Sequence, residues 1–362
     1  MAVAHRTISF ARGVPSPDLL PADDLAAAAA RALEKDPTGA LIYGGADGYP
    51  GLREWVADRY GVPVERVFLT NGSLQGMALL AELLFAGSGG HAIAEAPTYD
   101  RTLLLLKRFG ATVQGVRLEA DGMDVEALEA LLRSGTRPGL VYVIPSFQNP
   151  AGVTTSRVKR ERLVELATEH GFLLVEDDPY GELRFEGEAP PTMLSLDPGE
   201  RVLYSTSFTK TVAPGVRVGA LIIPSELRAR LLRLANDTYI GPVNLSQATV
   251  AEYCRAGRFD ANLPGIREQL RERRDALVAA VDRHLGERAE YVKPEGGYFL
   301  WLRLPRVDVD ALAGRADEAG VPFVKGSSCY IDGSGGDELR LAFSAVRPED
   351  MDPGIERLAA LL

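Results

Sequence analysis

The sequence predicts an α/β protein with two parts: a large domain on a mostly parallel, doubly wound sheet, and a smaller α+β domain at the carboxyl end. From residue 67 onward, short apolar runs alternate with longer segments of helical period. The length of 362 residues also exceeds that of a typical single domain. Polar side chains follow several of the apolar runs, at the sheet edge where open α/β proteins bind ligands.

Residues 1–42 are predicted to form an arm and a helix that precede the large domain. The segment 10–21 is rich in proline, and an alanine-rich helix follows over about 23–35, with Asp23 or Asp24 as its N-cap. A glycine-rich loop begins at Tyr43 and lacks the Gly-Lys-Ser/Thr ending of a P-loop.

The large domain is predicted over residues 43–256. Strands separated by helices of this length favour parallel pairing, with helices on both faces of the sheet. The predicted strands are 67–70, 91–95, 112–118, 140–144, 172–176, 202–205 and 216–223. The predicted helices are 52–60, 74–85, 98–109, 125–132, 156–170, 226–239 and 245–255.

The smaller domain is predicted over residues 257–362. It opens with a charged helix over 263–285 and then alternates strand 298–304, helix 309–319 and strand 339–343. We detect no internal repeat and no low-complexity segment.

Composition argues against several kinds of partner. The net charge is -10 and no basic run occurs, so we expect no nucleic acid partner. No run of 18 apolar residues occurs and the first ten residues lack a signal peptide's apolar stretch, so we expect no membrane association and a cytoplasmic protein. Two cysteines and four scattered histidines suggest neither a disulfide framework nor a metal site.

The stretch 205–219 carries the most specific chemistry. It reads Ser-Thr-Ser-Phe-Thr-Lys-Thr-Val-Ala-Pro-Gly-Val-Arg-Val-Gly, which places Lys210 between the hydroxyls of Ser207 and Thr209 and the guanidinium of Arg217. Arginine pairs with phosphate in a fork, and a lysine amine forms a Schiff base with an aldehyde. Only six of the 40 basic residues are lysines, so a lysine here points weakly to amine chemistry. Pyridoxal 5'-phosphate carries both a phosphate and an aldehyde.

Residues upstream supply the other contacts that this cofactor needs. Asp177 ends an apolar strand and can hold the pyridine nitrogen protonated, with Glu176 and Asp178 as rivals for that role. Asn149 and Tyr180 can bind the phenolic oxygen.

The ring and the phosphate have candidates of their own. Tyr99 can face the ring, with core packing as the alternative. Ser73 opens a helix whose free N–H groups can bind phosphate, together with Ser207, Thr209 and Arg217.

Arg340 is a candidate for binding a substrate carboxylate. It stands in a predicted strand with apolar neighbours on both sides, where an arginine needs an anionic partner. An internal salt bridge to a nearby Asp or Glu is the alternative.

Together these motifs resemble the fold type I pyridoxal-phosphate aminotransferases of class I/II, most closely the branch of 2-aminoadipate and kynurenine aminotransferases. The resemblance covers nearly the whole chain, and so many motifs in the family's order make it specific. The stretches that carry it are 43–52, 71–75, 95–99, 149–152, 176–180, 207–217, 294–301 and 340–344.

The resemblance implies a homodimer with shared active sites, acting on an amino acid and a 2-oxo acid. In this reading Lys210 holds the cofactor and moves the Cα proton. The cofactor contacts are those described above, made by Asp177, Asn149, Tyr180, Tyr99, Ser73, Ser207, Thr209 and Arg217. Tyr43 reaches over from the partner subunit. Arg340 binds the substrate carboxylate, and Asn149 also contacts the substrate.

Three positions depart from the family's pattern. Leu74 stands where relatives often have Gln, so it would contact the cofactor through its backbone N–H. Arg12 interrupts the usual Phe-Ala-Gly-Gly, and Lys325 replaces a common proline. We hypothesise that Arg12 or Lys325 binds a polar or anionic part of the substrate side chain. The alternative is that these two residues only carry charge on the protein surface.

Other functions remain open at this point. The same site could serve a pyridoxal-phosphate-dependent lyase, cyclase or oxidase of a specialised biosynthetic pathway. A transcription regulator on this fold would need a DNA-binding module, and about 40 residues before Tyr43 are too few for one. A nicotinamide-dependent oxidoreductase is disfavoured, because the glycines of 87–90 precede a strand rather than open a helix.

Overall fold

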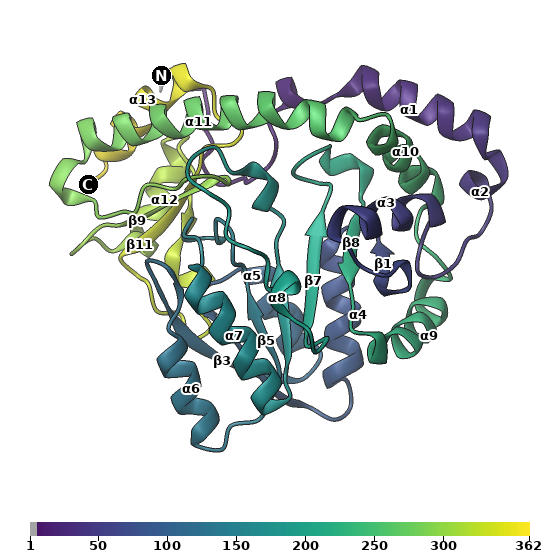
Figure 1. The fold of residues 1–362 in the computed structure, drawn as a ribbon. Coiled ribbons are helices and arrows are strands. Elements are labelled where there is room, and N and C mark those ends of the chain that lie inside the picture. Colours follow the sequence, from purple (N-terminus) through teal and green to yellow (C-terminus); the bar gives the residue numbers. More distant parts are fainter. Residues whose placement is uncertain (1–5) are drawn as a thin grey trace.

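Figure 1 shows the computed structural model, which describes residues 6–362. His5 and the rest of the segment 1–5, part of the predicted N-terminal arm, lie outside the described residues. An eight-stranded sheet forms the centre of the large domain, in the order β1-β8-β7-β6-β5-β2-β3-β4. Its strands are β1 (Val67–Thr70), β2 (Gly90–Ala96), β3 (Ala111–Glu119), β4 (Gly122–Met123), β5 (Pro138–Val143), β6 (Leu173–Asp177), β7 (Val202–Ser207) and β8 (Gly219–Ile222).

The prediction of a mostly parallel sheet is confirmed. Strands β3, β2, β5, β6 and β7 pair in parallel, one with the next. Strand β8 is antiparallel to both of its neighbours, β1 and β7. The short segment between β7 and β8 contains Lys210 and has no crossover helix, so the chain turns back beside the strand it has just left.

Helices cover both faces of this sheet. The helices of the large domain and its N-terminal approach are α1 (Ala22–Lys35), α2 (Pro37–Leu41), α3 (Pro50–Tyr60), α4 (Ser73–Phe85), α5 (Asp100–Arg108), α6 (Val125–Arg133), α7 (Arg157–His170), α8 (Met193–Leu196), α9 (Arg228–Tyr239) and α10 (Asn244–Arg255). Alternate strand residues enter two separate cores: Leu140 and Tyr142 pack with apolar residues of α4 and α5, whereas Val141 and Val143 pack with α3, α6 and α7. A strand buried on both faces explains why these sequences read as continuous apolar runs.

The carboxyl-terminal part is built on a three-stranded antiparallel sheet, in the order β10-β11-β9. Its elements are α11 (Arg258–His284), β9 (Phe299–Arg303), α12 (Val309–Glu318), β10 (Val324–Lys325), β11 (Glu338–Ala342) and α13 (Pro348–Ala359). The long helix α11 runs along one side of the molecule, from the end near α1 to the small sheet (Figure 1).

The N-terminal arm packs against this small sheet. The backbone N–H groups of Ile8 and Phe10 donate to the carbonyls of Gly320 and Pro322, and that of Ala342 donates to Phe10. The arm therefore lies beside β11, although more than 300 residues separate them in the chain.

Several local predictions need correction. Helix α1 begins at Ala22 after Pro21, so Asp23 and Asp24 lie in its first turn rather than at the N-cap, where their carboxylates still complement the helix dipole. The helices α2, α8 and α13 and the short strands β4 and β10 were not predicted from the sequence. The domain boundaries after residues 42 and 256 stay predictions.

None of the helices described within residues 6–362 combines the length and the apolar character that a membrane-spanning helix needs.

Candidate active site

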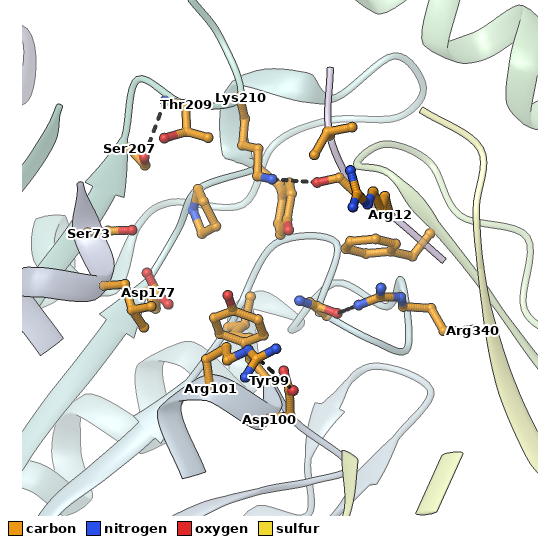
Figure 2. Close-up of a pocket in the computed structure, with 18 of the residues that line it drawn as sticks. Arg12, Ser73, Tyr99, Asp100, Arg101, Asp177, Ser207, Thr209, Lys210 and Arg340 are labelled. Carbon is orange, nitrogen blue, oxygen red and sulfur yellow. Dashed lines mark hydrogen bonds and ion pairs between the residues drawn. The ribbon is translucent and has the colours of Figure 1, made fainter. Parts of the chain in front are cut away.

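A cavity of about 640 Å³ opens at the carboxyl ends of the parallel strands. Figure 2 shows that its side chains come from the large domain, the N-terminal arm and the small sheet. Most of the predicted site residues line it: Arg12, Ser73, Leu74, Tyr99, Asn149, Asp177, Tyr180, Ser207, Thr209, Lys210, Arg217 and Arg340.

One end of the cavity is shaped for an anion. Helix α4 starts at Ser73 and points its free N–H groups at this end. Two glycines allow the close approach: a Cβ on Gly72, whose φ is +87°, would collide with the guanidinium of Arg217, and a Cβ on Gly219 would collide with the backbone nitrogen of Ser73. A helix N-terminus with a guanidinium beside it is a phosphate-binding arrangement.

Lys210 lies in the middle of the cavity. Its Nζ donates to the carbonyl of Gly13 at 2.7 Å and lies 5.2 Å from the ring centre of Tyr298. Burial, together with the positive charges of Arg340 and Arg217, lowers the pKa of Lys210 to about 8. More of the amine is therefore neutral, and hence nucleophilic, near neutral pH than in an exposed lysine.

Asp177 ends β6 and faces the cavity with one oxygen engaged and one free. Its Oδ2 accepts a hydrogen bond of 2.6 Å from the hydroxyl of Tyr142. Its Oδ1 is buried and has no hydrogen-bond partner among residues 6–362. Burial raises the pKa of Asp177 to about 6, and the hydroxyls of Tyr142 and, to a smaller extent, Ser205 oppose that rise. A free, buried carboxylate oxygen needs a donor from a ligand.

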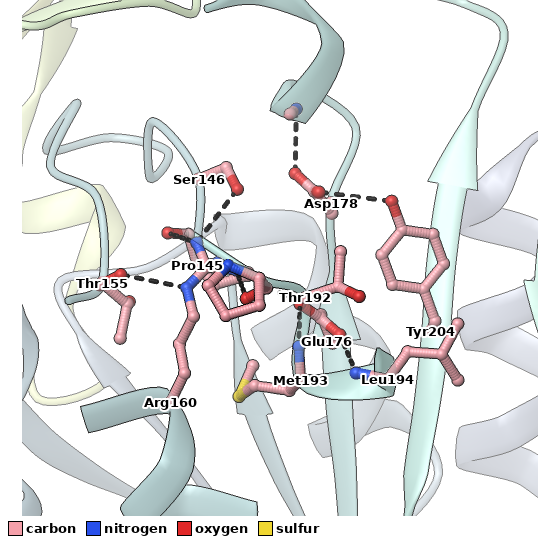
Figure 3. Close-up of polar contacts among 12 residues, drawn as sticks. Pro145, Ser146, Thr155, Arg160, Glu176, Asp178, Thr192, Met193, Leu194 and Tyr204 are labelled. Carbon is pink, nitrogen blue, oxygen red and sulfur yellow. Dashed lines mark hydrogen bonds and ion pairs between the residues drawn. The ribbon is translucent and has the colours of Figure 1, made fainter. Parts of the chain in front are cut away.

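The two rivals of Asp177 face elsewhere, in a buried network shown in Figure 3. Glu176 accepts the backbone N–H groups of Met193 and Leu194 at 2.9 and 2.8 Å. Asp178 accepts the N–H of Gly181 at 2.9 Å and the hydroxyl of Tyr204 at 3.2 Å. Because successive residues of a strand point to opposite faces, only Asp177 of these three lines the cavity.

Arg160 supplies the positive charge of this network. Its side chain is 1% exposed and lies 3.5 Å from the carboxylate of Glu176. It also donates to the carbonyls of Thr155 and Pro145 at 3.0 and 2.8 Å. The network ties β6 to the segments on either side of it, and so fixes the strand end that carries Asp177.

Arg340 is held by neutral groups rather than by a carboxylate. Its two Nη atoms donate to Asn149 Oδ1 and to the carbonyl of Ala11, both at 2.7 Å, and its Cζ lies 4.2 Å from the ring centre of Phe299. Its Nε is buried with no partner in the described part of the chain. Within residues 6–362 the internal salt bridge considered as an alternative is not formed, so the guanidinium charge is available to an anionic ligand.

Two predicted residues do not line the cavity. Lys325 is half-exposed and pairs with Asp310 at 3.1 Å. Tyr43 is 83% exposed on the outer surface.

Some residues of the site were not predicted from the sequence. Tyr142 lies inside an apolar strand, so the sequence indicated only a core residue at this position. Arg101 also lines the cavity, and a charged residue directly after the Tyr99 motif was an available signal. Nothing in the sequence indicated that the carbonyl of Gly13 would accept a hydrogen bond from Lys210.

The residues present fit pyridoxal phosphate. The anion-binding end suits its phosphate, the free Oδ1 of Asp177 suits a protonated pyridine nitrogen, and Lys210 suits its aldehyde. Within residues 6–362 no cluster of three or more His, Cys, Asp or Glu side chains could hold a metal ion.

Comparisons with known proteins agree with this geometry. A family model for class I and II aminotransferases matches residues 7–358. The chain is 35% identical to the 2-aminoadipate transaminase of Thermus thermophilus, over 98% of this chain and 90% of that protein. It is 34% identical to aromatic-amino-acid aminotransferase 1 of Thermococcus litoralis, over 97% and 87%. Its fold is similar to that of the Pyrococcus horikoshii kynurenine aminotransferase in complex with PMP, with a TM-score of 0.94 and 33% identity over 99% of this chain and 91% of that one.

Removing the hydroxyl of Tyr142 should weaken cofactor binding. In Tyr142→Phe, Asp177 loses the hydrogen bond that opposes protonation, so its pKa rises and less of it is ionised at neutral pH. We expect the dissociation constant of pyridoxal phosphate at pH 7 to rise about tenfold or more. The loss should shrink as the pH is raised and Asp177 ionises. Tyr253→Phe, a buried tyrosine outside the cavity, is the matched control. An unchanged constant in Tyr142→Phe would contradict this role.

Replacing Arg160 should destabilise the protein. Arg160→Met leaves Glu176 buried without its cation, which costs about 3–5 kcal/mol of unfolding free energy. Burial already raises the pKa of Glu176 to about 7, and loss of Arg160 raises it further, so the cost should grow above pH 7 as ionisation favours the unfolded state. Urea denaturation at pH 6 and pH 8.5 measures both effects. Arg157→Met, on the exposed face of the same helix, should change stability by no more than about 0.5 kcal/mol.

Proposed function

The chain belongs to the class I and II aminotransferases, and we propose that Lys210 is the residue on which its reaction depends. The enzyme uses pyridoxal phosphate to transfer amino groups from amino acids to 2-oxo acids. The observation that carries the proposal is that Nζ of Lys210 and the free Oδ1 of Asp177 open onto one cavity. An amine for the aldehyde and an acceptor for the pyridine nitrogen are the two groups that this chemistry requires.

Lys210 both holds the cofactor and moves the proton. When bound, pyridoxal phosphate acts as an electron sink that makes the Cα–H bond of the substrate acidic. The amine of Lys210 would take the proton from Cα of the substrate and deliver it to the cofactor carbon that carries the aldehyde. Its lowered pKa suits it to act as a base near neutral pH.

The surrounding side chains orient the cofactor. Ser73 and the backbone N–H of Leu74, at the start of α4, bind the phosphate together with Ser207, Thr209 and Arg217. Tyr99 packs against the ring. Asp177 accepts the pyridine N–H.

The polar groups on the other side of the cavity complete the site. Asn149 and the hydroxyl of Tyr180 bind the phenolic oxygen. Arg340 binds the α-carboxylate of the substrate, and its hydrogen bond to Asn149 couples the substrate and cofactor positions.

We further propose that the active unit is a homodimer. An apolar patch, formed by Leu41, Ile42, Tyr43, Ile240 and Val243, is 49–83% exposed in the single chain. Patches of this kind mark interfaces. The amide of Asn244 donates to the carbonyl of Ile42 at 3.0 Å, which joins the two segments of the patch.

The patch also adjoins the cavity. The backbone N–H of Val243 donates to Asn71 at 2.9 Å, two residues before Ser73. A second chain on the patch therefore lies next to the phosphate end, and its Tyr43 reaches that site.

Borohydride trapping tests the role of Lys210. After reduction in the presence of pyridoxal phosphate, we expect a pyridoxyl adduct on the peptide that contains Lys210, with a yield that rises as the pH passes through about 8 and the amine becomes neutral. Arg340→Gln removes a neighbouring cation, raises the pKa of Lys210 and should move that midpoint to higher pH. Adducts confined to surface lysines such as Lys293 would refute the assignment.

Disrupting the apolar patch should separate the subunits. Ile42→Asp places a charge in the proposed interface and should raise the dimer dissociation constant about a hundredfold, as measured by sedimentation equilibrium. Val158→Asp, at a more exposed apolar residue on α7, is the control and should have no effect. A wild-type protein that sediments as a monomer would refute the proposed dimer.

A further inference from the structure

We propose that Arg12 binds a second carboxylate, at the far end of the substrate, and so selects dicarboxylic amino acids and 2-oxo acids. This inference rests on the proposed function, because it places the first carboxylate on Arg340. It assigns the second one to a residue of the N-terminal arm.

The arm holds the backbone of Arg12 in a fixed position. The carbonyls on either side of it accept hydrogen bonds from the site itself: Ala11 from Arg340 and Gly13 from Lys210, each at 2.7 Å. One residue further out, the carbonyl of Val14 accepts from the hydroxyl of Ser344 at 2.8 Å. The α-carbon of Arg12 is therefore anchored between the reactive lysine and the arginine that binds the α-carboxylate.

Packing strengthens this anchoring. The ring of Phe299 lies against Gly13, where a Cβ would collide with it, and also against the guanidinium of Arg340. In Figure 2 the side chain of Arg12 lies on the same side of the cavity as Arg340. Because the arm is fixed in advance, ordering it costs little when a ligand binds.

The charges that line the cavity leave one cation without an assigned partner. The protein as a whole carries a net charge of -10. The cavity nevertheless has five cationic side chains against two carboxylates: Arg12, Arg101, Lys210, Arg217 and Arg340 against Asp100 and Asp177.

Each of the other cations has a partner or an assigned role. Arg217 is assigned to the phosphate, Arg340 to the α-carboxylate and Lys210 to the aldehyde. Arg101 is paired with Asp100 at 3.6 Å. Arg12 forms no ion pair or side-chain hydrogen bond within residues 6–362, although it lines the cavity. One unpaired guanidinium matches one additional carboxylate.

This placement also decides between the two residues that the sequence singled out. Lys325 is outside the lining and is neutralised by Asp310, whereas Arg12 is an exposed residue that lines the cavity and forms no ion pair within residues 6–362.

The test compares ligands with one and two carboxylates on the holoenzyme. Isothermal titration calorimetry measures the dissociation constants of adipate, glutarate and hexanoate, which bind without reacting. We expect a dicarboxylate to bind wild type at least tenfold more tightly than hexanoate, and Arg12→Gln to abolish that preference. Arg133→Gln, an exposed arginine on α6, is the control and should retain it.

Kinetics give the second readout. The ratio of kcat/KM for glutamate or 2-aminoadipate to that for norleucine should fall at least tenfold in Arg12→Gln. Equal losses for acidic and apolar donors, or an unchanged ratio, would overturn the role of Arg12. So would a wild-type preference for basic donors, which would implicate Asp100. If no donor supports transamination in wild type, the proposed function fails, whatever the binding data show.

Discussion

The site depends on one buried carboxylate that keeps a single oxygen free. Asp177 could not present Oδ1 to a ligand if its position were loose, because a buried carboxylate rotates toward any available donor. Two sets of contacts fix the position of Asp177. Tyr142 occupies Oδ2, and the network of Arg160, Glu176 and Asp178 holds the strand end on the opposite face. Strand alternation therefore separates three consecutive acidic residues into one that faces the cavity and two that belong to the buried network.

The N-terminal arm is the second constraint, because it joins the two halves of the site. It hydrogen-bonds to the small sheet through Ile8 and Phe10, and then passes Lys210 of the large domain at Gly13. Lys210 and Arg340 come from different sheets, yet both donate to carbonyls of the same three-residue segment. The distance between the amine of Lys210 and the guanidinium of Arg340 is thus set by a short piece of chain, not by the packing of two domains alone.

The parallel sheet and most residues of the candidate site could be predicted from the sequence. Apolar strand runs alternate with segments of helical period, and this alternation predicts a parallel sheet. Because ligands bind at the carboxyl ends of such strands, it also places Ser73, Tyr99, Asn149 and Asp177 together without any knowledge of side-chain contacts. Contacts across long separations could not be predicted in the same way. The hydroxyl of Tyr142 is invisible in an apolar run, and Gly13 reaches Lys210 across 197 positions. Asp23 and Asp24 were misplaced because an N-cap and a first-turn acid leave the same sequence signal.

The way the cations are held explains how an acidic protein can exchange anions at this site. Arg340 donates to an amide oxygen and a carbonyl. A neutral acceptor positions a cation but leaves its charge uncompensated, so an incoming carboxylate does not have to displace another carboxylate. The same reasoning applies in reverse to release, since the departing 2-oxo acid leaves behind groups that are already hydrogen-bonded. A site that must bind an amino acid, release an oxo acid and repeat the cycle in the other direction benefits from cations held by neutral partners. Lys325, neutralised by Asp310, illustrates the arrangement that would not serve.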